Sequence, residues 1–410
     1  MQDTRVKSVS VPLMRPQLPR AKDLLPYLNL IDSNQIYSNF GPLNELLQSQ
    51  LGQKMFEWFG VRPHVITTSN GTSAIEILLQ TLRLPPNSRV LVPALTFVAT
   101  CTAVRRMGYQ PIIADVDADS WLMTPKSIAG INLDGIAAVI PVATFGAPQD
   151  ARAWSKWSNK TGIKVIIDAA AGFGSQNVAE NVPAAFSLHA TKALGAAEGG
   201  FILTLDSEQA TNVKKLTNFG IPDLSDCVGT NAKLSEYHAA IALAALKAWE
   251  STLAKRVSAL KSYMNGLQQS LRQGNIGVQS AMANVPSVFL VRFNSKKERD
   301  RCMHLCDESG VGTRVWYTPL MGSHPATVGV ARACELRNAR FLEDRLLGLP
   351  FYPGLTALDI DSVVALVKGA CADSAGRGEF DSGYLANSRG RIAFPAAISR
   401  STAGDLSVLS

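Results

Sequence analysis

The chain has 410 residues, of which 46% are apolar and 18% charged, and a net charge of +7 at neutral pH. This composition is typical of a soluble globular protein, and the length predicts two domains, because single cores stop growing at shorter lengths. No apolar run approaches the roughly 18 residues of a membrane span, and the N-terminus lacks a signal-peptide core, so we expect a cytoplasmic protein. The mild charge, without a Lys/Arg cluster, is compatible with an anionic small-molecule substrate or with nucleic acid.

Seven short apolar segments between His64 and Leu205 predict buried strands. In chain order they are HVITTS, RVLVPA, PIIADVD, AAVIPV, KVIIDA, AAFSLH and GGFILTL. Most are continuous apolar runs, as expected for strands covered on both faces. Helical patterns such as TSAIEILLQTLRL, and TFVATCTAVRRMG ending at Gly108, lie between several of them. This alternation predicts an α/β fold with a mainly parallel sheet.

The pattern changes at Asn231, where a long region with apolar residues at helical spacing begins. The segments VPSVFLVRF, SKKERDRCMHLCDESG, TRVWY and LDIDSVVALVKGA then predict a smaller α+β domain. We therefore expect a large domain with an N-terminal arm over residues 1–250 and a small C-terminal domain over residues 251–370. Residues 371–410 have few large apolar side chains and predict a flexible tail.

The six cysteines are scattered along the chain and are expected to be reduced thiols. Cys302 and Cys306 would lie on one face of a helix, with His304 off that face. Because no second pair of ligands follows them, no metal site is expected.

One lysine, Lys192, stands among small and apolar residues in AFSLHATKALGAAEGG. A lysine is rarely buried without a partner, so the alternative is a loop or helix-start lysine whose amine reaches solvent. Asp168 ends the predicted strand KVIIDA, where open α/β sheets bind ligands. Its alternative role is to cap the following turn. Since one short segment and one strand separate them, the two side chains could face the same crevice.

The segment SNGTSAIEILL places Gly71, Thr72 and Ser73 at the start of a predicted helix. Free N–H groups and hydroxyls there suit a phosphate, although an ordinary N-cap at Thr72 or Ser73 explains the pattern as well. Phe97 could lie flat on an aromatic ligand, or belong to the core. Pyridoxal phosphate (PLP) would use a lysine, an anion at its ring nitrogen, a phosphate site and a surface against its ring. The four features together therefore predict PLP as the cofactor.

With these residues the chain resembles the DegT/DnrJ/EryC1/StrS aminotransferases, a family of PLP-dependent enzymes that aminate keto sugars. The resemblance runs from about Val11 to Lys368. It rests on eight motifs in the family's order: YSNFGPL, SNGTSA, VPALTFVAT, IADVD, IIDAAAGFG, FSLHATKALGAAEGG, GTNAKLSEYHAAIAL and LGLPFYPGLT. It implies the PLP-transferase fold of type I, whose large domain holds a seven-stranded, mainly parallel sheet.

The resemblance also implies roles for individual residues. Lys192 would be the Schiff-base lysine, and Asp168 would pair with the ring nitrogen. Asn231 would reach the phosphate from a neighbouring subunit, which implies a homodimer; its alternative role is the N-cap of the long helix. The residues implied to bind the cofactor are Gly71, Thr72, Ser73, Phe97, Asp168, Ser187, Lys192 and Asn231.

Tyr37, Asn39 and Tyr317 lie in segments that border the sugar site in the family. The chain departs from the family at Ala171, where a Gln or His usually contacts the ring hydroxyl of the cofactor. A methyl group cannot make that hydrogen bond. We interpret His189, in SLHATK, as a packed strand residue rather than a catalyst.

The implied reaction transfers an amino group, by resemblance from L-glutamate, to a nucleotide-linked keto-deoxysugar in amino-sugar biosynthesis, for a surface polysaccharide or an antibiotic. The partners would then be small molecules and a second subunit, with neither nucleic acid nor membrane. Three alternatives remain: a transaminase for another cyclic ketone such as an inosose, a non-catalytic regulatory protein with the same fold, and a plain nucleotide-binding α/β protein. Lys192 argues against a dehydratase subgroup in which histidine replaces the lysine.

Overall fold

The computed structural model describes residues 10–221, 228–282 and 286–372. The chain up to Asp373 forms one compact unit. Of the predicted tail, residues 371 and 372 end the last helix, and the others lie outside the described residues. Within the described ranges, no helix is both long and apolar enough to cross a membrane.

The larger core surrounds short strands that form two ladders, ordered β3-β2-β4-β5 and β1-β8-β7-β6. The strands are β1 (His64–Thr68), β2 (Arg89–Pro93), β3 (Gln110–Ala114), β4 (Ile136–Val139), β5 (Lys164–Val165), β6 (Ile167–Asp168), β7 (Ala184–Ser187) and β8 (Gly200–Thr204). β5 and β6 are one segment interrupted only at Ile166, whose N–H bonds the carbonyl of Val139 at 3.1 Å. The two ladders therefore meet at this segment.

All seven predicted segments are strands, and only KVIIDA is divided into two. Neighbours from β3 to β7 run parallel, whereas β8 is antiparallel to both β7 and β1. All five residues of β8 are buried, because helices cover the sheet. The predicted α/β class with a mainly parallel sheet is confirmed.

Helices and one 3-10 turn pack around the sheet in chain order. They are α1 (Ala21–Asn34), α2 (Pro42–Phe59), α3 (Gly71–Thr81), α4 (Val98–Arg106), η1 (Thr144–Gly146), α5 (Ala151–Thr161), α6 (Ser207–Thr217) and α7 (Glu236–Lys247). α3 packs on β7 and β8, and α7 packs on α1 and α2. The predicted long helical region is two helices, because the chain breaks at Ala248 between α7 and the next helix.

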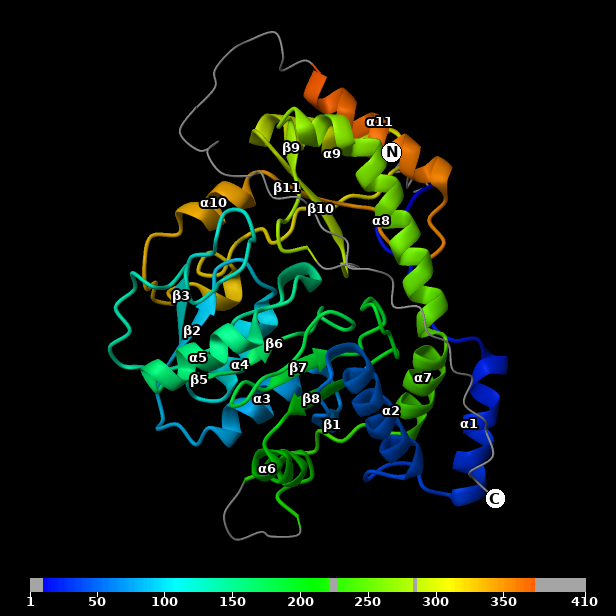
Figure 1. Cartoon of the computed structure of the whole chain (residues 1–410), viewed down its shortest axis with the longest axis vertical. Helices are drawn as coiled ribbons and strands as arrows, with labels where there is room; N and C mark the ends of the chain where they lie inside the picture. The colour runs from blue at the N-terminus through cyan, green and yellow to red at the C-terminus, as the bar shows by residue number, and fades with distance from the viewer. Residues whose placement is uncertain (1–9, 222–227, 283–285, 373–410) are drawn as a thin grey trace, which may run out of the picture. The chain divides into compact units, whose positions relative to one another are not determined.

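A second, smaller core lies beyond this break. Its elements are α8 (Trp249–Arg272), β9 (Ile276–Gly277), β10 (Phe289–Phe293), α9 (Lys296–Glu308), β11 (Leu346–Leu349) and α11 (Ala357–Ala372). The chain between α9 and β11 returns to the larger core, where η2 (Pro325–Thr327) packs on α4 and α10 (Arg337–Glu343) buries Ala339 and Leu342. β9, β10 and β11 form an antiparallel sheet, and Figure 1 shows α8 extending from α7 towards α9 and α11. Val11 of the N-terminal arm packs into this core. The larger core also takes in Leu290 and residues between 320 and 346, so the two cores do not divide the chain simply at residue 250, and the predicted domain boundary stays a prediction.

The cysteines lie as the helical spacing predicts. Cys302 and Cys306 are fully buried in the smaller core, whereas His304 is exposed on another face of α9 and pairs with Glu308 at 3.5 Å. The five cysteines within the described residues are free thiols.

Candidate active site

Asp168 lies at the end of β6 and is only 4% exposed. Its Oδ2 accepts a hydrogen bond from Thr100 Oγ1 (2.7 Å), and its Oδ1 accepts one from the N–H of Ala170 (3.0 Å). Burial raises the pKa of the carboxyl group, while these two bonds and the charge of Lys192 lower it. Asp168 therefore caps the turn that follows β6, which is the alternative role considered for it. It also lies within reach of the charge of Lys192.

Lys192 follows β7 in a turn closed by a bond from its N–H to the carbonyl of His189 (2.8 Å). Burial lowers the pKa of its amine, and the charge of Asp168 raises it. Lys192 is half-buried in this turn, and burial opposes the charge of its amine. A lysine with a lowered pKa is a better nucleophile and proton acceptor at neutral pH. Asp168 is close enough for its charge to act on the Lys192 amine, and the roles of both residues towards a cofactor stay predictions.

Three aromatic rings lie beside this pair. The ring of Tyr317 stacks on Phe145 at 5.3 Å and lies 6.3 Å from the ring of Phe97, measured between centroids. Burial and the charge of Asp168 both raise the pKa of the Tyr317 hydroxyl. Phe97 is 57% exposed, so its alternative role as a core residue is wrong. An exposed ring next to Asp168 and Lys192 offers a face to a flat ligand.

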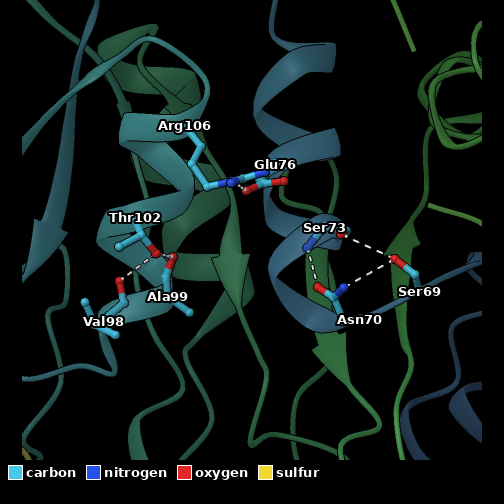
Figure 2. Close-up of polar contacts among 8 residues, drawn as sticks. All are labelled: Ser69, Asn70, Ser73, Glu76, Val98, Ala99, Thr102 and Arg106. Carbon is cyan, nitrogen blue, oxygen red and sulfur yellow. Dashed lines mark hydrogen bonds and ion pairs between the residues drawn. The ribbon is translucent and has the colours of Figure 1, made fainter. Parts of the chain in front are cut away.

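The N-terminus of α3 forms a second part of the site. Asn70 is the N-cap, and its Oδ1 accepts the N–H of Ser73 at 2.8 Å (Figure 2). Thr72 and Ser73 therefore belong to the first helical turn, and the alternative that either is the N-cap is wrong. The first N–H groups of a helix have no acceptor within the helix and attract anions. Figure 2 also shows the ion pair of Arg106 with Glu76 (2.6 Å), which joins α4 to α3.

Glycines bring this helix terminus close to the strand ends. A Cβ on Gly71 would lie 2.8 Å from the Cβ of Ser187, the last residue of β7. A Cβ on Gly200 would lie 2.6 Å from the carbonyl carbon of Asn70. The N-terminus of α3 and Ser187 therefore face the same small space, and Lys192 follows Ser187 by five residues.

Sequence reasoning missed the hydroxyl groups behind Asp168. Thr100 is fully buried in α4, and its Oγ1 lies 2.9 Å from the Oγ1 of Thr96, which is 1% exposed. Because Thr100 donates its proton to Asp168, the hydroxyl of Thr96 donates to Thr100. The spacing of four residues in TFVAT, at the start of a helix, is the signal that could have indicated this pair. Phe145 was also missed, and its sequence context holds no signal.

Tyr37 and Asn39 lie apart from the residues around Lys192. They line a cavity of about 530 Å³ formed by residues 35–42 and Glu45, none of which belongs to the group around Lys192. The ring of Tyr37 stacks on that of Tyr237 at 6.4 Å, and the N–H of Glu236 bonds the carbonyl of Tyr37 at 3.0 Å. The structure therefore places this loop against α7.

Two further interpretations are corrected by the structure. Asn231 is exposed and pairs with Asn218 in an isolated bridge, whereas Ser235 is the N-cap of α7. His189 lies beyond the end of β7 with its side chain 46% exposed, so it is not a packed strand residue; its Nδ1 lies 2.9 Å from Thr191 Oγ1. Ala171 is partly exposed in the turn after Asp168.

The donor set fits PLP. The buried carboxylate of Asp168 matches the ring nitrogen of PLP, and the amine of Lys192 matches its aldehyde. The exposed ring of Phe97 matches the face of the PLP ring. The N-terminus of α3, which Gly71 allows to approach Ser187, matches the phosphate. Fold and site together define a PLP-dependent enzyme of fold type I.

Comparison with known proteins narrows this class. The chain belongs to the DegT/DnrJ/EryC1/StrS aminotransferase family, whose model matches residues 21–368. It is 27% identical to dTDP-4-amino-4,6-dideoxy-D-glucose transaminase of Shigella dysenteriae, over 86% of this chain and 97% of that protein. The predicted class of PLP-dependent aminotransferase is thereby confirmed at the level of the family.

Solved structures agree with this assignment. DesI, crystallised in the presence of its TDP-sugar product, superposes with a TM-score of 0.78 at 27% identity, covering 89% of this chain and 93% of that one. NtdA of Bacillus subtilis, with bound PMP, superposes with a TM-score of 0.77 at 24% identity, covering 88% of each chain. The second likeness supports the fold.

Proposed function

We propose that this protein uses PLP to transfer an amino group from L-glutamate to a nucleotide-linked keto-deoxysugar. The observation that carries the proposal is that the buried Asp168 carboxylate and the Lys192 amine are close enough for each charge to shift the pKa of the other group. The similarity to a dTDP-sugar transaminase and to DesI supports a nucleotide sugar as the acceptor. We place the reaction in amino-sugar biosynthesis in the cytoplasm.

Each residue then has a defined task. When bound, PLP supplies an electron sink for the carbon that carries the amino group. Lys192 would hold the cofactor through Nζ and would serve as general base and acid for the proton of the substrate Cα. Asp168 would stabilise a proton at the ring nitrogen, because a carboxylate stabilises an adjacent positive charge. Phe97 would offer its face to the ring.

The phosphate would be held by the first turn of α3 and by Ser187. The N–H groups of Gly71 and Thr72 and the hydroxyls of Thr72, Ser73 and Ser187 are the donors. We further propose that Asn231 of a second subunit reaches this phosphate, so that the site is complete in a homodimer. Its exposure supports this role. Tyr37, Asn39 and Tyr317 are proposed to border the sugar nucleotide.

The test is the absorbance spectrum of the purified protein with PLP, before and after addition of L-glutamate. We expect a visible band of the lysine-linked cofactor that glutamate converts to the bleached PMP form. A band that glutamate leaves unchanged would contradict L-glutamate as donor. The absence of any band after addition of PLP would contradict the cofactor role of Lys192.

A further inference from the structure

Arg256, on α8, is a buried cation that the mechanism above does not use. The residue is 5% exposed, and its guanidinium lies over the ring of Phe351, with Cζ 5.5 Å from the ring centroid. Nη1 donates to the carbonyls of Pro286 (3.2 Å) and Ser287 (3.3 Å). Nε is buried and has no hydrogen-bond partner among the described residues.

No carboxylate of the described chain compensates this charge. Burial alone lowers the pKa of Arg256 to about 10, and no acidic neighbour raises it again. Removing an unpaired cation from water costs several kcal/mol, so buried arginines are usually paired with an anion. A buried guanidinium with an unused donor therefore indicates that an anionic partner is still to bind.

A small cavity lies beside Arg256. It is lined by Arg256 and Thr252 of α8, by Arg15 of the N-terminal arm and by the turn that carries Lys192. Three of its lining residues are cationic and none is acidic. Its volume of about 30 Å³ admits roughly two water molecules or a single carboxylate group, since one water needs about 10–15 Å³.

We propose that this cavity is the subsite for a carboxylate of the amino donor. The inference rests on the proposed function, which requires an amino acid to approach Lys192. In an α-amino acid one carbon separates the carboxylate from the amine. A carboxylate bound between Arg256 and Arg15 therefore keeps the amine close to Lys192, which lines the same cavity. Arg256 supplies the buried charge, and Arg15, which is exposed, closes the outer side.

Calorimetric titration with glutarate tests the subsite, because glutarate has the carboxylates of glutamate and no amine to react. The full-length protein is titrated with and without PLP. We expect Arg256→Gln to weaken glutarate binding about tenfold or more, since hydrogen bonds to charged groups contribute about 1.5–3 kcal/mol. The Gln amide ends near the position of Nε and does not reach the Pro286 and Ser287 carbonyls, which bond Nη1, so a second variant is needed that leaves these bonds in place.

Arg15→Gln keeps the test decisive if the Arg256 variant does not fold. It should weaken binding about two- to fivefold, as expected for an exposed charge. Arg20→Gln is the matched control, because Arg20 is exposed on the same arm and does not line the cavity. It should bind glutarate like the wild type.

Equal glutarate affinity in the wild type and both cavity variants would overturn the subsite, as would tighter binding of inorganic phosphate than of glutarate at the same residues. The visible band with PLP separately tests the proposed function. If the wild type forms the band with PLP, but Arg256→Gln binds glutarate as tightly as the wild type does, the proposed function stands and the proposed subsite is wrong. If no band forms, the titration without PLP still decides whether the cavity binds a carboxylate.

Discussion

Asp168 is buried and Lys192 half-buried in the same site, and burial opposes the charge of both. It raises the pKa of the carboxyl group and lowers that of the amine. Thr100 and the N–H of Ala170 stabilise the carboxylate, whereas Asp168 itself is the charge that raises the pKa of Lys192. The hydroxyl pair of Thr96 and Thr100 therefore stabilises the ionised form of Asp168 and partly offsets the effect of burial.

Replacing Thr100 by valine tests this hydroxyl pair. Thr100→Val removes the donor to Asp168 and should raise the pKa of the carboxyl group further. The PLP ring nitrogen then loses its counter-ion at a higher pH, which a pH titration of the visible spectrum measures. Thr100→Ser keeps the hydroxyl and should titrate like the wild type. Identical titrations of the valine and serine variants would contradict this role.

The same substitution predicts a pH dependence of stability. Because the folded pKa of Asp168 lies above its ordinary value of 3.8, the folded state binds this proton more tightly than the unfolded state. The contribution of Asp168 to the stability of the cofactor-free protein is therefore lost as the pH rises from 3.8 through the pKa of Asp168 in the folded state. Thr100→Val should extend this loss to higher pH and lower stability at neutral pH by about 1–3 kcal/mol. Urea unfolding at several pH values measures both effects.

The position of α3 depends on a close approach between its first turn and the end of β7. Its N-terminus meets the end of β7 at Gly71, where a side chain would contact Ser187. The N-cap Asn70 satisfies the N–H of Ser73, which leaves the earlier N–H groups for a ligand. A helix terminus this close to the strand that leads to Lys192 can hold the phosphate of a cofactor attached to that lysine.

Gly71→Ala should therefore weaken PLP binding roughly tenfold, because a shift of the helix lengthens the charge-assisted bonds to the phosphate. The dissociation constant is measured by absorbance titration. Gly369→Ala is the matched control: it lies inside α11, and its added Cβ would meet no atom within 4 Å. The control should leave PLP binding unchanged and stabilise the protein by about 0.5–1 kcal/mol. Unchanged affinity in Gly71→Ala would contradict the phosphate site.

The loop with Tyr37 and Asn39 is held by a contact between α7 and α2. Glu236 is 1% exposed, and its carboxylate accepts the N–H groups of Leu43 (2.8 Å) and Asn44 (2.9 Å) in the first turn of α2. Because its own N–H bonds the carbonyl of Tyr37, Glu236 fixes the loop on both sides.

Glu236→Gln replaces one of the two acceptor oxygens with an amide nitrogen that faces an N–H group. We expect the free energy of unfolding to fall by about 1–3 kcal/mol, measured by urea denaturation. Glu45→Gln removes an exposed carboxylate from the same turn of α2 and should change stability by less than about 0.5 kcal/mol. Equal effects of the two substitutions would mean that Glu236 does not fix the loop.

On the scale of the whole molecule, apolar side chains gather near the segments that carry Asn231 and Tyr37. Tyr37, Phe219, Ile221 and Tyr237 are each 46–51% exposed. Tyr37 stacks on Tyr237, and Phe219 and Ile221 lie two residues apart in the chain. Exposed apolar pairs of this kind are typical of protein interfaces. They support the proposed homodimer, in which Asn231 reaches the site of the other subunit.

Mixing of two inactive variants tests this shared site. Lys192→Ala and Asn231→Ala chains are dissociated, mixed and reassociated. In a mixed dimer one of the two sites has both natural residues, so about one quarter of wild-type activity should return. Each variant taken alone through the same procedure is the control. If mixed dimers form without recovery of activity, Asn231 acts within its own subunit or not at the site.

Much of the fold and the central pair of the site could be predicted because their signals are local. The strands appear as apolar runs, and Asp168 and Lys192 stand at strand ends that a parallel sheet brings to one edge. The interpretation of His189 as a packed strand residue is wrong, and so are the alternatives of a core role for Phe97 and an N-cap role for Asn231, because burial depends on neighbours distant in sequence.

The sequence by itself determined the fold class, the strand segments along the chain and the position of Asp168 and Lys192 next to strand ends, because periodicity and residue type specify these locally. Only the tertiary structure decided which groups surround the pair. Thr100 meets Asp168 across 68 residues, and Phe145 stacks on Tyr317. Arg256 is buried beside the turn of Lys192, without a counter-ion among the residues that the structure describes. These contacts depend on how helices and loops pack on the sheet, which no short stretch of residues encodes.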